Sequence, residues 1–392
     1  MLIGLDAISL TEPLAGVGHY TLELARALAR AAPLEDFELV YPSSYPSLKL
    51  NEAQPPSPTN LKPVRVRVGA LGRRWFAAGL PRYVRRRGLA LFHGTNYEVP
   101  LWGGGAKVVT IHDLSLLLRP ETHEAGRVRR ARRRLPLMLR ASDAVITPTE
   151  SVRREVCEHL RAPASKVFAV PEAARECFKP LAFVETEETR RRLGVGDEFL
   201  LTVGTVEPRK NLPALLAAFE EVLRARPRSD LQLVIAGGRG WMSGPTFETI
   251  EKSPARERVV LAGYLCDRDL RALYSSCRLF IYPSLYEGFG LPPLEAMGCG
   301  AAVVAGRAPA VAEVTGGAAR LVDSTSPEEL TRALVELLDD DAARRALSDA
   351  GLRRAAEFSW ERTARMTLEV YAEALKRRAK QKDEDGRMKD EG

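Results

Sequence analysis

A glycine-rich segment between two carboxylates is the part of this sequence best suited to chemistry. Glu287 and Glu295 flank Gly288-Phe289-Gly290-Leu291-Pro292-Pro293-Leu294. The apolar run 279–282 before it and residues 296–298 after it predict a buried strand, a loop and the start of a helix. A helix that starts there directs free backbone N–H groups at the loop, which favours binding of a phosphate. Phosphate donors beside carboxylates that can accept from hydroxyls indicate a sugar nucleotide.

Two adjacent cations follow the first strand expected in the second half of the chain. Arg209 and Lys210 come shortly after the apolar run Phe199–Val203. Arginine can donate to two oxygens at once and lysine is a compact charge, so the pair suits a diphosphate. The alternative is a cationic turn that leads into a helix capped by Asn211.

Residues at strand ends in the first half are further candidates. Gly16 and Gly18 would let a ligand approach the backbone, although they do not extend to the full dinucleotide-binding fingerprint. His112 comes at the end of a predicted strand, where it could contact a sugar hydroxyl while Asp113 orients it. A structural histidine beside a helix-capping aspartate is the alternative. No cluster has metal-ligand spacing, and Asp267 is better explained as a helix cap.

Strands alternate with helices along both halves, which predicts parallel sheets covered on both faces. The expected strands are Leu2–Ile8, Phe37–Tyr41, Val64–Val68, Leu89–His93, Val108–His112, Ala144–Thr147, Val167–Val170, Phe199–Val203, Leu231–Ala236, Val259–Leu261, Leu279–Tyr282, Ala302–Val304 and Ala319–Val322. The expected helices include Val17–Ala31, Leu212–Ala225, Leu270–Cys277, Pro327–Leu338 and Ala342–Phe358. The proline-rich segment Asn51–Pro63 predicts an exposed loop.

The fold class is therefore α/β, with two doubly wound Rossmann-like domains. We place them at residues 1–179 and 180–375, followed by a charged, disordered tail at 376–392. Ligands of open parallel sheets bind beyond the carboxyl ends of the strands, so we expect the site in the cleft between the domains.

Composition narrows the class of protein. The 392 residues are 45% hydrophobic and 28% charged, as in soluble globular proteins, and no run of 18 apolar residues occurs. The five scattered cysteines and the absence of a signal-peptide pattern at the N-terminus predict a cytoplasmic protein with free thiols.

Positive charge is concentrated in the first half of the chain. Residues 1–179 carry 27 Lys and Arg against 17 Asp and Glu, whereas the remainder carries 31 against 34. Two clusters, Arg82–Arg87 and Arg127–Arg134, account for most of the excess. Such clusters attract phosphates, anionic lipids or nucleic acid, or they are simply solvated helix faces. No nucleic-acid motif accompanies them, so we expect no nucleic-acid partner.

Together these segments resemble the retaining GT-B glycosyltransferases of family 4, particularly the bacterial mannosyltransferase-like branch. The segment from Glu287 to Glu295 is the most specific match. Glu207-Pro208-Arg209-Lys210-Asn211 and Ile111-His112-Asp113 support it in the same order. Residues 308–314 resemble a later acidic segment of the family, and residues 358–361 resemble the start of a closing helix that packs back on the first domain.

The resemblance implies a role for each matching residue. Glu287 would contact the donor-sugar hydroxyls, Glu295 would hold the ribose, and His112 would contact the transferring sugar. Arg209 and Lys210 would neutralise the diphosphate. Backbone amides for the sugar and phosphate would come from Gly288, Phe289, Gly290 and Leu291. Gly16 and Gly18 would line the floor of the donor site near the phosphate and the acceptor. Many family members carry Gly-Arg where this chain has Gly204-Thr205, so Arg209 must supply any guanidinium from a different place.

The implied activity is hexose transfer from a GDP- or UDP-sugar, with GDP-mannose favoured, to a glycan or lipid-linked acceptor. The resemblance implies retention of the anomeric configuration, a donor-binding second domain and an acceptor-binding first domain. No cofactor and no metal are expected. The arginine clusters would then dock the first domain on an anionic membrane, as a peripheral protein of the inner face. The alternatives are another GT-B enzyme, such as a sugar-nucleotide epimerase or a phosphorylase, or a non-enzymatic basic protein that binds polyanions.

Overall fold

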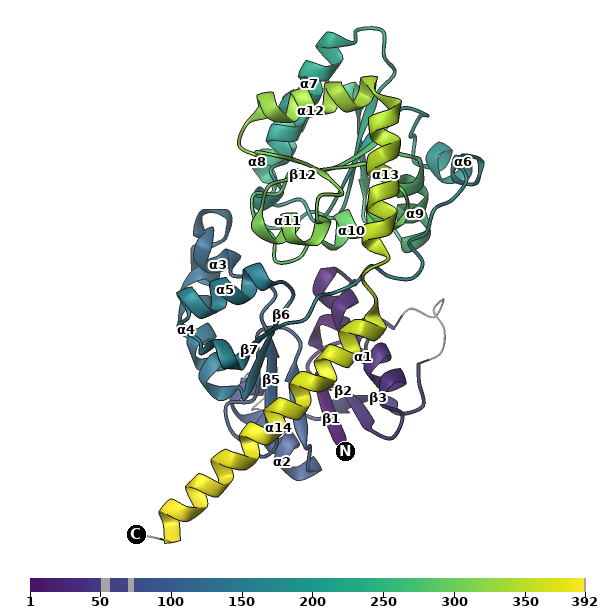
Figure 1. The fold of residues 1–392 in the computed structure, drawn as a ribbon. Coiled ribbons are helices and arrows are strands. Elements are labelled where there is room, and N and C mark those ends of the chain that lie inside the picture. The colour runs from purple at the N-terminus through teal and green to yellow at the C-terminus, as the bar shows by residue number, and fades with distance from the viewer. Residues whose placement is uncertain (51–56, 70–73, 391–392) are drawn as a thin grey trace. The chain divides into compact units, whose positions relative to one another are not determined.

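The chain forms two α/β units in a computed structural model that describes residues 1–50, 57–69 and 74–390 (Figure 1). The first unit comprises residues 1–114, 130–172 and 359–392, and the second comprises residues 115–129 and 173–358. Apart from residues 115–129, the chain enters the second unit after Glu172, a few residues before the boundary expected at 179, and it returns to the first unit at Ser359.

The first unit contains a seven-stranded sheet in the order β3-β2-β1-β4-β5-β6-β7, with every neighbouring pair parallel. Its strands are β1 (Leu2–Asp6), β2 (Asp36–Pro42), β3 (Leu61–Val66), β4 (Leu91–Gly94), β5 (Ala106–Thr110), β6 (Ala144–Thr147) and β7 (Val167–Ala169). The central strands are buried along nearly their whole length. Continuous burial is the pattern of a parallel strand covered by helices on both faces.

Helices of two kinds surround this sheet. The bounds are α1 (Gly16–Ala31), α2 (Leu80–Arg87), α4 (Ala125–Ala141), α5 (Glu150–His159) and α14 (Trp360–Asp390). Helix α1 is amphipathic and buries Leu24, Ala25 and Leu28. By contrast, α2 and α4 are rich in arginine, and α4 begins within the range of the second unit before it continues in the first.

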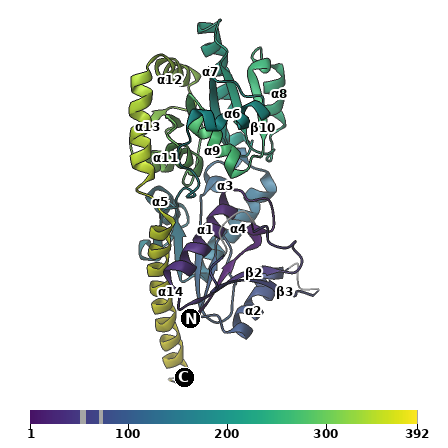
Figure 2. The same ribbon diagram turned by 90° about the vertical axis from the view of Figure 1, so that its right-hand side faces the viewer.

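The C-terminal helix α14 packs on the first unit beside α1 and strands β5 and β6 (Figures 1 and 2). The hydroxyl of Tyr371 lies 2.7 Å from His93 Nδ1, and both side chains are buried. Near the start of α14, Thr363 donates to the carbonyl of Pro171 at 2.7 Å. Helix α14 runs on to Asp390, so the structure has helix where a disordered tail was expected from residue 376.

The second unit contains a six-stranded sheet in the order β10-β9-β8-β11-β12-β13, again parallel throughout. Its strands are β8 (Phe199–Val203), β9 (Gln232–Ala236), β10 (Val259–Gly263), β11 (Leu279–Tyr282), β12 (Val303–Gly306) and β13 (Arg320–Val322). Its helices are α3 (Ser115–Leu118), α6 (Phe183–Arg192), α7 (Leu212–Ala225), α8 (Gly244–Lys252), α9 (Asp267–Ser276), α10 (Leu291–Gly298), α11 (Pro309–Thr315), α12 (Pro327–Asp339) and α13 (Asp341–Ala355).

Two apolar cores cover the two faces of this second sheet. One contains Leu215, Phe219 and Leu334 with alternate strand residues such as Leu233 and Ile281. The other contains the strand residues of opposite parity, including Phe280 and Tyr282, together with Tyr274 and Met297. The alternation of strand side chains between two cores is the geometry of a doubly wound sheet.

Each strand expected from the sequence is present, with ends that either agree with the prediction or differ from it by a few residues. One loop prediction was partly wrong, because residues 61–63 belong to β3. This is the edge strand of its sheet, where a proline such as Pro63 is tolerated. Residues 51–56 of the same predicted loop lie outside the described residues. In the described part of the chain, no helix is long and apolar enough to cross a membrane.

Candidate functional site

The second sheet reverses its strand order between β8 and β11. From β8 the chain proceeds outward to β9 and β10, and from β11 it proceeds outward on the other side to β12 and β13. The loops that leave the carboxyl ends of β8 and β11 therefore diverge, and such a switch point is where open α/β sheets bind ligands. Residues 204–211 and 283–290 form these two loops.

The two loops join through a compact group of charges. Glu287 accepts from Lys210 Nζ at 2.6 Å through Oε1 and from Arg209 Nη1 at 2.7 Å through Oε2. Arg209 also donates from Nη1 to the carbonyl of Tyr286 at 2.8 Å. The structure thus brings together three predicted site residues that are 77 and 78 positions apart in the chain.

A second carboxylate, which the sequence analysis did not select, completes this group. Glu207 Oε1 accepts from Arg209 Nη2 at 2.7 Å, and its side chain is almost fully buried. Arg209 is therefore held between Glu207 and Glu287. In the sequence Glu207 belongs to the segment Glu207–Asn211 that supports the family resemblance, but no role was predicted for it.

The electrostatics of the group follow from burial and charge. Burial alone would raise the pKa of Glu287, but attraction to Arg209 and Lys210 and their hydrogen bonds outweigh it and lower this pKa to about 2. For Glu207, burial is the stronger influence, and its pKa is raised despite the nearby Arg209. Glu287 is thus a firmly ionised acceptor and a poor base.

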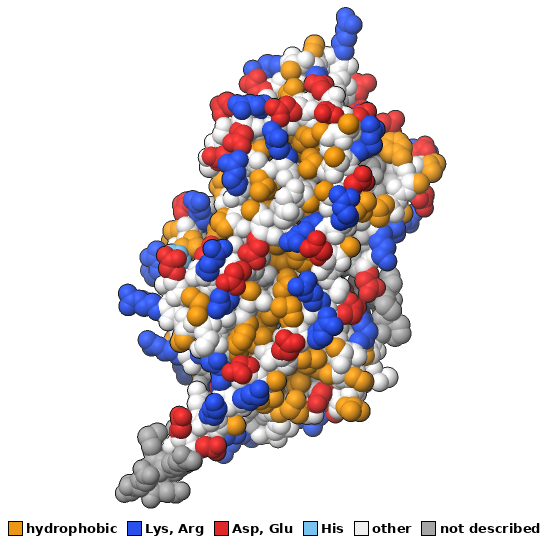
Figure 3. Space-filling model, in the orientation of Figure 1, with side chains coloured by type: hydrophobic (Ala, Val, Ile, Leu, Met, Phe, Trp, Pro, Cys, Tyr) orange, Lys and Arg blue, Asp and Glu red, His pale blue; other side chains and the backbone are white. Residues whose placement is uncertain are grey.

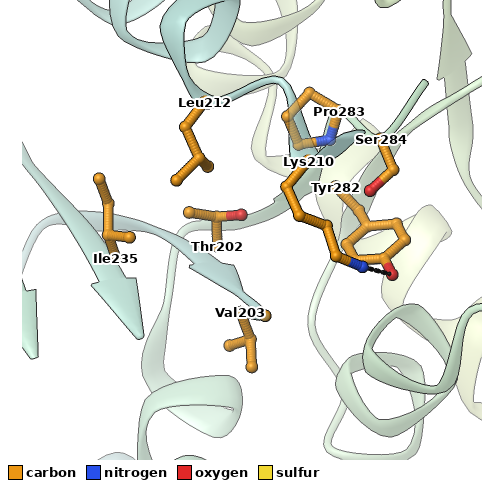
Figure 4. Close-up of a pocket in the computed structure, with 9 residues that line it drawn as sticks. Thr202, Val203, Lys210, Leu212, Ile235, Tyr282, Pro283 and Ser284 are labelled. Atoms are coloured by element: carbon orange, nitrogen blue, oxygen red, sulfur yellow. Dashed lines mark hydrogen bonds between the residues drawn. The ribbon is translucent and has the colours of Figure 1, made fainter. Parts of the chain in front are cut away.

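Lys210 lies over a small pocket at the end of β8 and β11 (Figure 4). Its amine donates to the hydroxyl of Tyr282 at 2.8 Å and lies 4.8 Å from the centre of that ring. The side chain of Lys210 packs closely against Gly204, where a Cβ would lie 3.3 Å from Lys210 Cε. The amine is thereby fixed at the switch point by Tyr282 and Glu287.

Helix α10 starts directly after this group. Gly290 has φ of +105°, a conformation that favours glycine, and the helix begins at Leu291. Because residues 292 and 293 are prolines and have no N–H, the backbone donors of the first turn are limited to residues up to Leu291. The side chain of Phe289 packs on Leu294, Val314 and Phe358, so only its backbone could face a ligand.

Glu295 lies on α10 and is bound by a buried arginine. Its Oε1 accepts from Arg175 Nε at 3.2 Å and Nη2 at 2.9 Å, and its Oε2 accepts from Tyr274 at 3.3 Å. Burial raises the pKa of Glu295, and the charge of Arg175 offsets part of this effect. Arg175 also donates to Asp267 at 2.5 Å. Sequence reasoning missed Arg175, which lies 120 positions before Glu295.

The two acids Asp267 and Asp269 each form an ion pair with an arginine and are not arranged as a metal site. Asp267 pairs with Arg175 and Asp269 pairs with Arg192, each at 2.5 Å. Asp267 is the first residue of α9 and not its cap, which is Cys266. Across the described residues, no group of three His, Cys, Asp or Glu side chains is arranged to hold a metal ion.

His112 lies in the first unit, just beyond β5. Its Nε2 lies 2.8 Å from the carbonyl oxygen of Thr95, and its Nδ1 lies 3.3 Å from Glu172 Oε1. The partner of its Nδ1 is thus Glu172, where the sequence analysis had suggested that Asp113 would orient the ring. Burial would lower the pKa of His112, but the hydrogen bond and charge of Glu172 outweigh it and raise this pKa.

The two predicted glycines of the first unit lie at the start of α1. Gly16 is exposed, and a Cβ there would meet no atom within 4 Å. At Gly18, a Cβ would lie 3.1 Å from both Leu14 Cδ2 and the Ser9 carbonyl oxygen. Gly18 therefore permits close packing, whereas Gly16 has open space beside it.

The arginine clusters lie on α2 and α4 and are mostly exposed. Two of their members are paired, since Arg87 binds Glu38 and Arg134 binds Glu98. On the face drawn in Figure 3, positive side chains lie among acidic ones and form no continuous patch. The exposed side chains of Leu101 and Trp102 lie near the segment that leads into α2. The N–H of Leu101 donates to the Phe76 carbonyl at 3.4 Å, and Trp102 Nε1 donates to the Ala77 carbonyl at 2.8 Å.

Solved structures with the same fold are GT-B proteins, which defines the fold class of this chain. Sucrose-phosphate synthase of Thermosynechococcus elongatus aligns with a TM-score of 0.73 at 20% identity, over 95% of this chain and 98% of that one. Anabaena HepE in complex with UDP and glucose aligns with a TM-score of 0.72 at 18% identity, over 95% and 99% of the two chains. At these identities the likeness shows the fold alone.

Sequence comparison then identifies the family. Residues 14–173 match the family described as "Glycosyltransferase Family 4". Residues 185–354 match the family described as "Glycosyl transferases group 1". The chain is 30% identical to O-antigen chain mannosyltransferase B of Escherichia coli over 369 residues, which are 92% of this chain and 96% of that protein. It is 37% identical over 199 residues to MMP alpha-(1->4)-mannosyltransferase of Mycolicibacterium hassiacum, half of this chain and 47% of that protein. The chain belongs to glycosyltransferase family 4 and is a glycosyltransferase.

Proposed function

We propose that this protein transfers a hexose from a nucleoside-diphosphate sugar to a glycan or lipid-linked acceptor, with retention of anomeric configuration. The observation that carries the proposal is the grouping of Arg209, Lys210 and Glu287 at the switch point, beside the first turn of α10. This grouping supplies cations and backbone N–H groups for a diphosphate and a carboxylate for sugar hydroxyls.

Mannose is the favoured hexose, and GDP-mannose the favoured donor. The support for mannose comes from relatives named as mannosyltransferases, among them the full-length match from Escherichia coli. UDP-sugars are the alternative donors, since HepE was solved with UDP-glucose and UDP.

The chemical step would be driven by stabilisation of the leaving diphosphate. Departure of the diphosphate builds negative charge on its oxygens, and the amine of Lys210 and the N–H groups near Leu291 would stabilise that charge. One well-placed donor of this kind contributes about 3–4 kcal/mol to transition-state stabilisation. Because protein cations supply the charge, the proposed reaction needs no metal ion and no cofactor.

Retention would follow from a front-face reaction and not from a covalent intermediate. Glu287 is paired with two cations and its pKa is lowered to about 2, so it is a weak nucleophile. The leaving phosphate would instead take the proton of the acceptor hydroxyl as the new bond forms. The two acids would then serve as a donor clamp, with Glu287 on the transferring sugar and Glu295 on the ribose.

The acceptor is proposed to be a glycan at an anionic membrane surface. Exposed Leu101 and Trp102 contact the segment that leads into α2, and α2 carries exposed arginines. Apolar and positive side chains on one surface favour the membrane interface. The protein would then act as a peripheral protein on the cytoplasmic face of the inner membrane.

A donor screen tests the proposed function. The protein is incubated with GDP-mannose, UDP-glucose and related donors, an acceptor glycan and EDTA, and products are identified by mass and by the anomeric coupling in NMR spectra. Transfer in EDTA with the donor's anomeric configuration is expected. Inversion would contradict the retaining mechanism, loss of transfer in EDTA would contradict metal independence, and epimerised nucleotide sugar without transfer would contradict the whole proposal.

A further inference from the structure

The ring of His112 has an oxygen acceptor at each of its nitrogens. Nε2 lies 2.8 Å from the carbonyl oxygen of Thr95, which can only accept, so Nε2 carries a hydrogen. Nδ1 lies 3.3 Å from Glu172 Oε1. In a neutral ring with its hydrogen on Nε2, the lone pair of Nδ1 would face a carboxylate oxygen. This repulsive contact becomes favourable only when a proton lies between the two atoms.

The arrangement is buried and assembled from three separate loops. Thr95 follows β4, His112 follows β5 and Glu172 follows β7, so the three residues meet at the carboxyl edge of the first sheet. The side chain of His112 is 12% exposed and that of Glu172 is 5% exposed. Burial of a carboxylate to this degree costs free energy of folding unless a positive charge or a hydrogen bond compensates it. A protonated His112 supplies both to Glu172.

Aromatic rings fix the orientation of the imidazole. The ring of Tyr20 contacts it edge-on with centroids 4.8 Å apart, and the ring of Tyr97 does so at 5.9 Å. The segment that carries Glu172 is itself anchored, since the neighbouring Pro171 carbonyl accepts from Thr363 of α14. The ring and the carboxylate are therefore both held in place before any ligand binds.

We propose that Glu172 is a positioning residue for hexosyl transfer, which holds His112 as an imidazolium in a single orientation. This inference rests on the proposed function and deepens it. Because both N–H groups are occupied, His112 contributes a fixed positive charge and a rigid surface, and not a free donor for a sugar hydroxyl. A fixed charge of this kind would favour departure of the diphosphate.

Other charges around the ring agree with this assignment. Burial lowers the pKa of His93 to about 3, so this neighbouring histidine is neutral and adds no repulsion. Asp113 adds a further favourable electrostatic influence on the charged ring. The titratable groups that face His112 are Glu172, Asp113, His93, Tyr20 and Tyr97.

The first experiment measures the protonation of His112 in the whole protein without any substrate. The five histidines are labelled with ¹⁵N, and the His112 signals are assigned by their loss in His112→Asn. Both ring nitrogens of His112 should remain protonated above pH 6.5, which is about the ordinary midpoint of histidine titration. In Glu172→Gln the midpoint should fall by about one pH unit or more, because Gln keeps the shape but removes the charge. Glu176→Gln, an exposed acid on the same segment, should leave it unchanged.

The second experiment asks whether this protonation matters for transfer. Glu172→Gln should lower kcat about tenfold or more with little change in donor KM, and Glu172→Asp, which keeps the charge, should recover part of the loss. A wild-type His112 that titrates at or below pH 6.5, or a Glu172→Gln enzyme with normal kcat, would overturn the inference. Failure of the wild-type enzyme to transfer any sugar would contradict the proposed function, while the NMR titration would still decide the state of the pair.

Discussion

Lys210 Nζ lies 2.6 Å from Glu287 Oε1, so one cation of the proposed phosphate site is neutralised by a carboxylate of the proposed sugar site. The pair ties the loop after β8 to the loop after β11 at the switch point of the sheet. A bound diphosphate would share the amine of Lys210 with Glu287. The ion pair thus presets the spacing between phosphate and sugar ligands before the donor binds.

Replacement of Lys210 by alanine is expected to impair catalysis far more than stability. The variant loses the amine that faces the leaving group, and a fall in kcat of about 10²–10³-fold is expected. Glu287 keeps its hydrogen bond from Arg209, so the loop retains its anchor. Initial rates at saturating donor and a thermal melt measure both effects. Lys252→Ala, at an exposed position of α8, is the matched control, and an unchanged kcat in Lys210→Ala would remove this lysine from the site.

Glu287 should contribute a distinct component to acid stability. Its pKa is lowered from 4.5 to about 2 in the folded protein, so its ionised form stabilises the fold above pH 4.5. This contribution, about 3 kcal/mol, is lost as the pH falls from 4.5 through about 2. Urea unfolding at neutral pH and at about pH 3 measures the larger part of this loss, about 2 kcal/mol.

In Glu287→Gln, this share of the pH dependence should disappear, and stability at neutral pH should fall by a similar amount. Glu248→Gln, on the exposed side of α8, should keep the wild-type dependence. Equal acid sensitivity in wild type and Glu287→Gln would contradict the lowered pKa.

Variants of Glu295 and Tyr274 distinguish the proposed contact of Glu295 with the ribose from the contribution of these two side chains to stability. An ionised carboxylate can accept about four hydrogen bonds, and Glu295 already accepts three. Glu295→Gln should raise donor KM about tenfold with little change in kcat, and it should cost about 3 kcal/mol because Arg175 loses a charged partner.

Tyr274→Phe removes only the hydrogen bond to Oε2, which should cost about 1 kcal/mol and leave KM nearly unchanged. Binding of the donor measured by calorimetry, together with urea unfolding, distinguishes the two variants. A normal donor KM in Glu295→Gln would refute the ribose assignment.

The sheets could be predicted from the sequence because their strands are short apolar runs. Ala144–Thr147 and Leu279–Tyr282 were predicted with the bounds that the structure has. Strand β3 was harder, because Leu61-Lys62-Pro63-Val64-Arg65-Val66 combines a proline with exposed polar residues, as an edge strand allows. Helix α4 was not recognised, because its buried apolar positions Val128, Leu135 and Met138 lie among so many arginines that they show no clear helical periodicity.

The site could be predicted only in part. The rule that ligands bind beyond the carboxyl ends of strands selected Arg209, Lys210 and Glu287, and the structure brings these three together. The rule says nothing about which side chains pair with one another. The pairs Arg175–Glu295 and His112–Glu172 depend on how distant loops pack, and neither has a signal in residue spacing.

Binding to an anionic membrane should depend on the surface formed by Leu101, Trp102 and the exposed arginines of α2. Flotation with vesicles of neutral lipid and with vesicles containing anionic lipid is expected to show binding only to the latter, and salt should weaken it. Each arginine near such a surface contributes about 1 kcal/mol, so the double variant Arg85→Ala/Arg86→Ala should lower the bound fraction strongly. Trp102→Ala should lower the bound fraction at every salt concentration, because the contribution of this side chain is apolar.

The control variant Arg345→Ala/Arg353→Ala removes the same net charge from α13 of the second unit. Equal loss in both double variants would mean that net charge alone drives the binding, and equal flotation with neutral and anionic vesicles would contradict the docking surface.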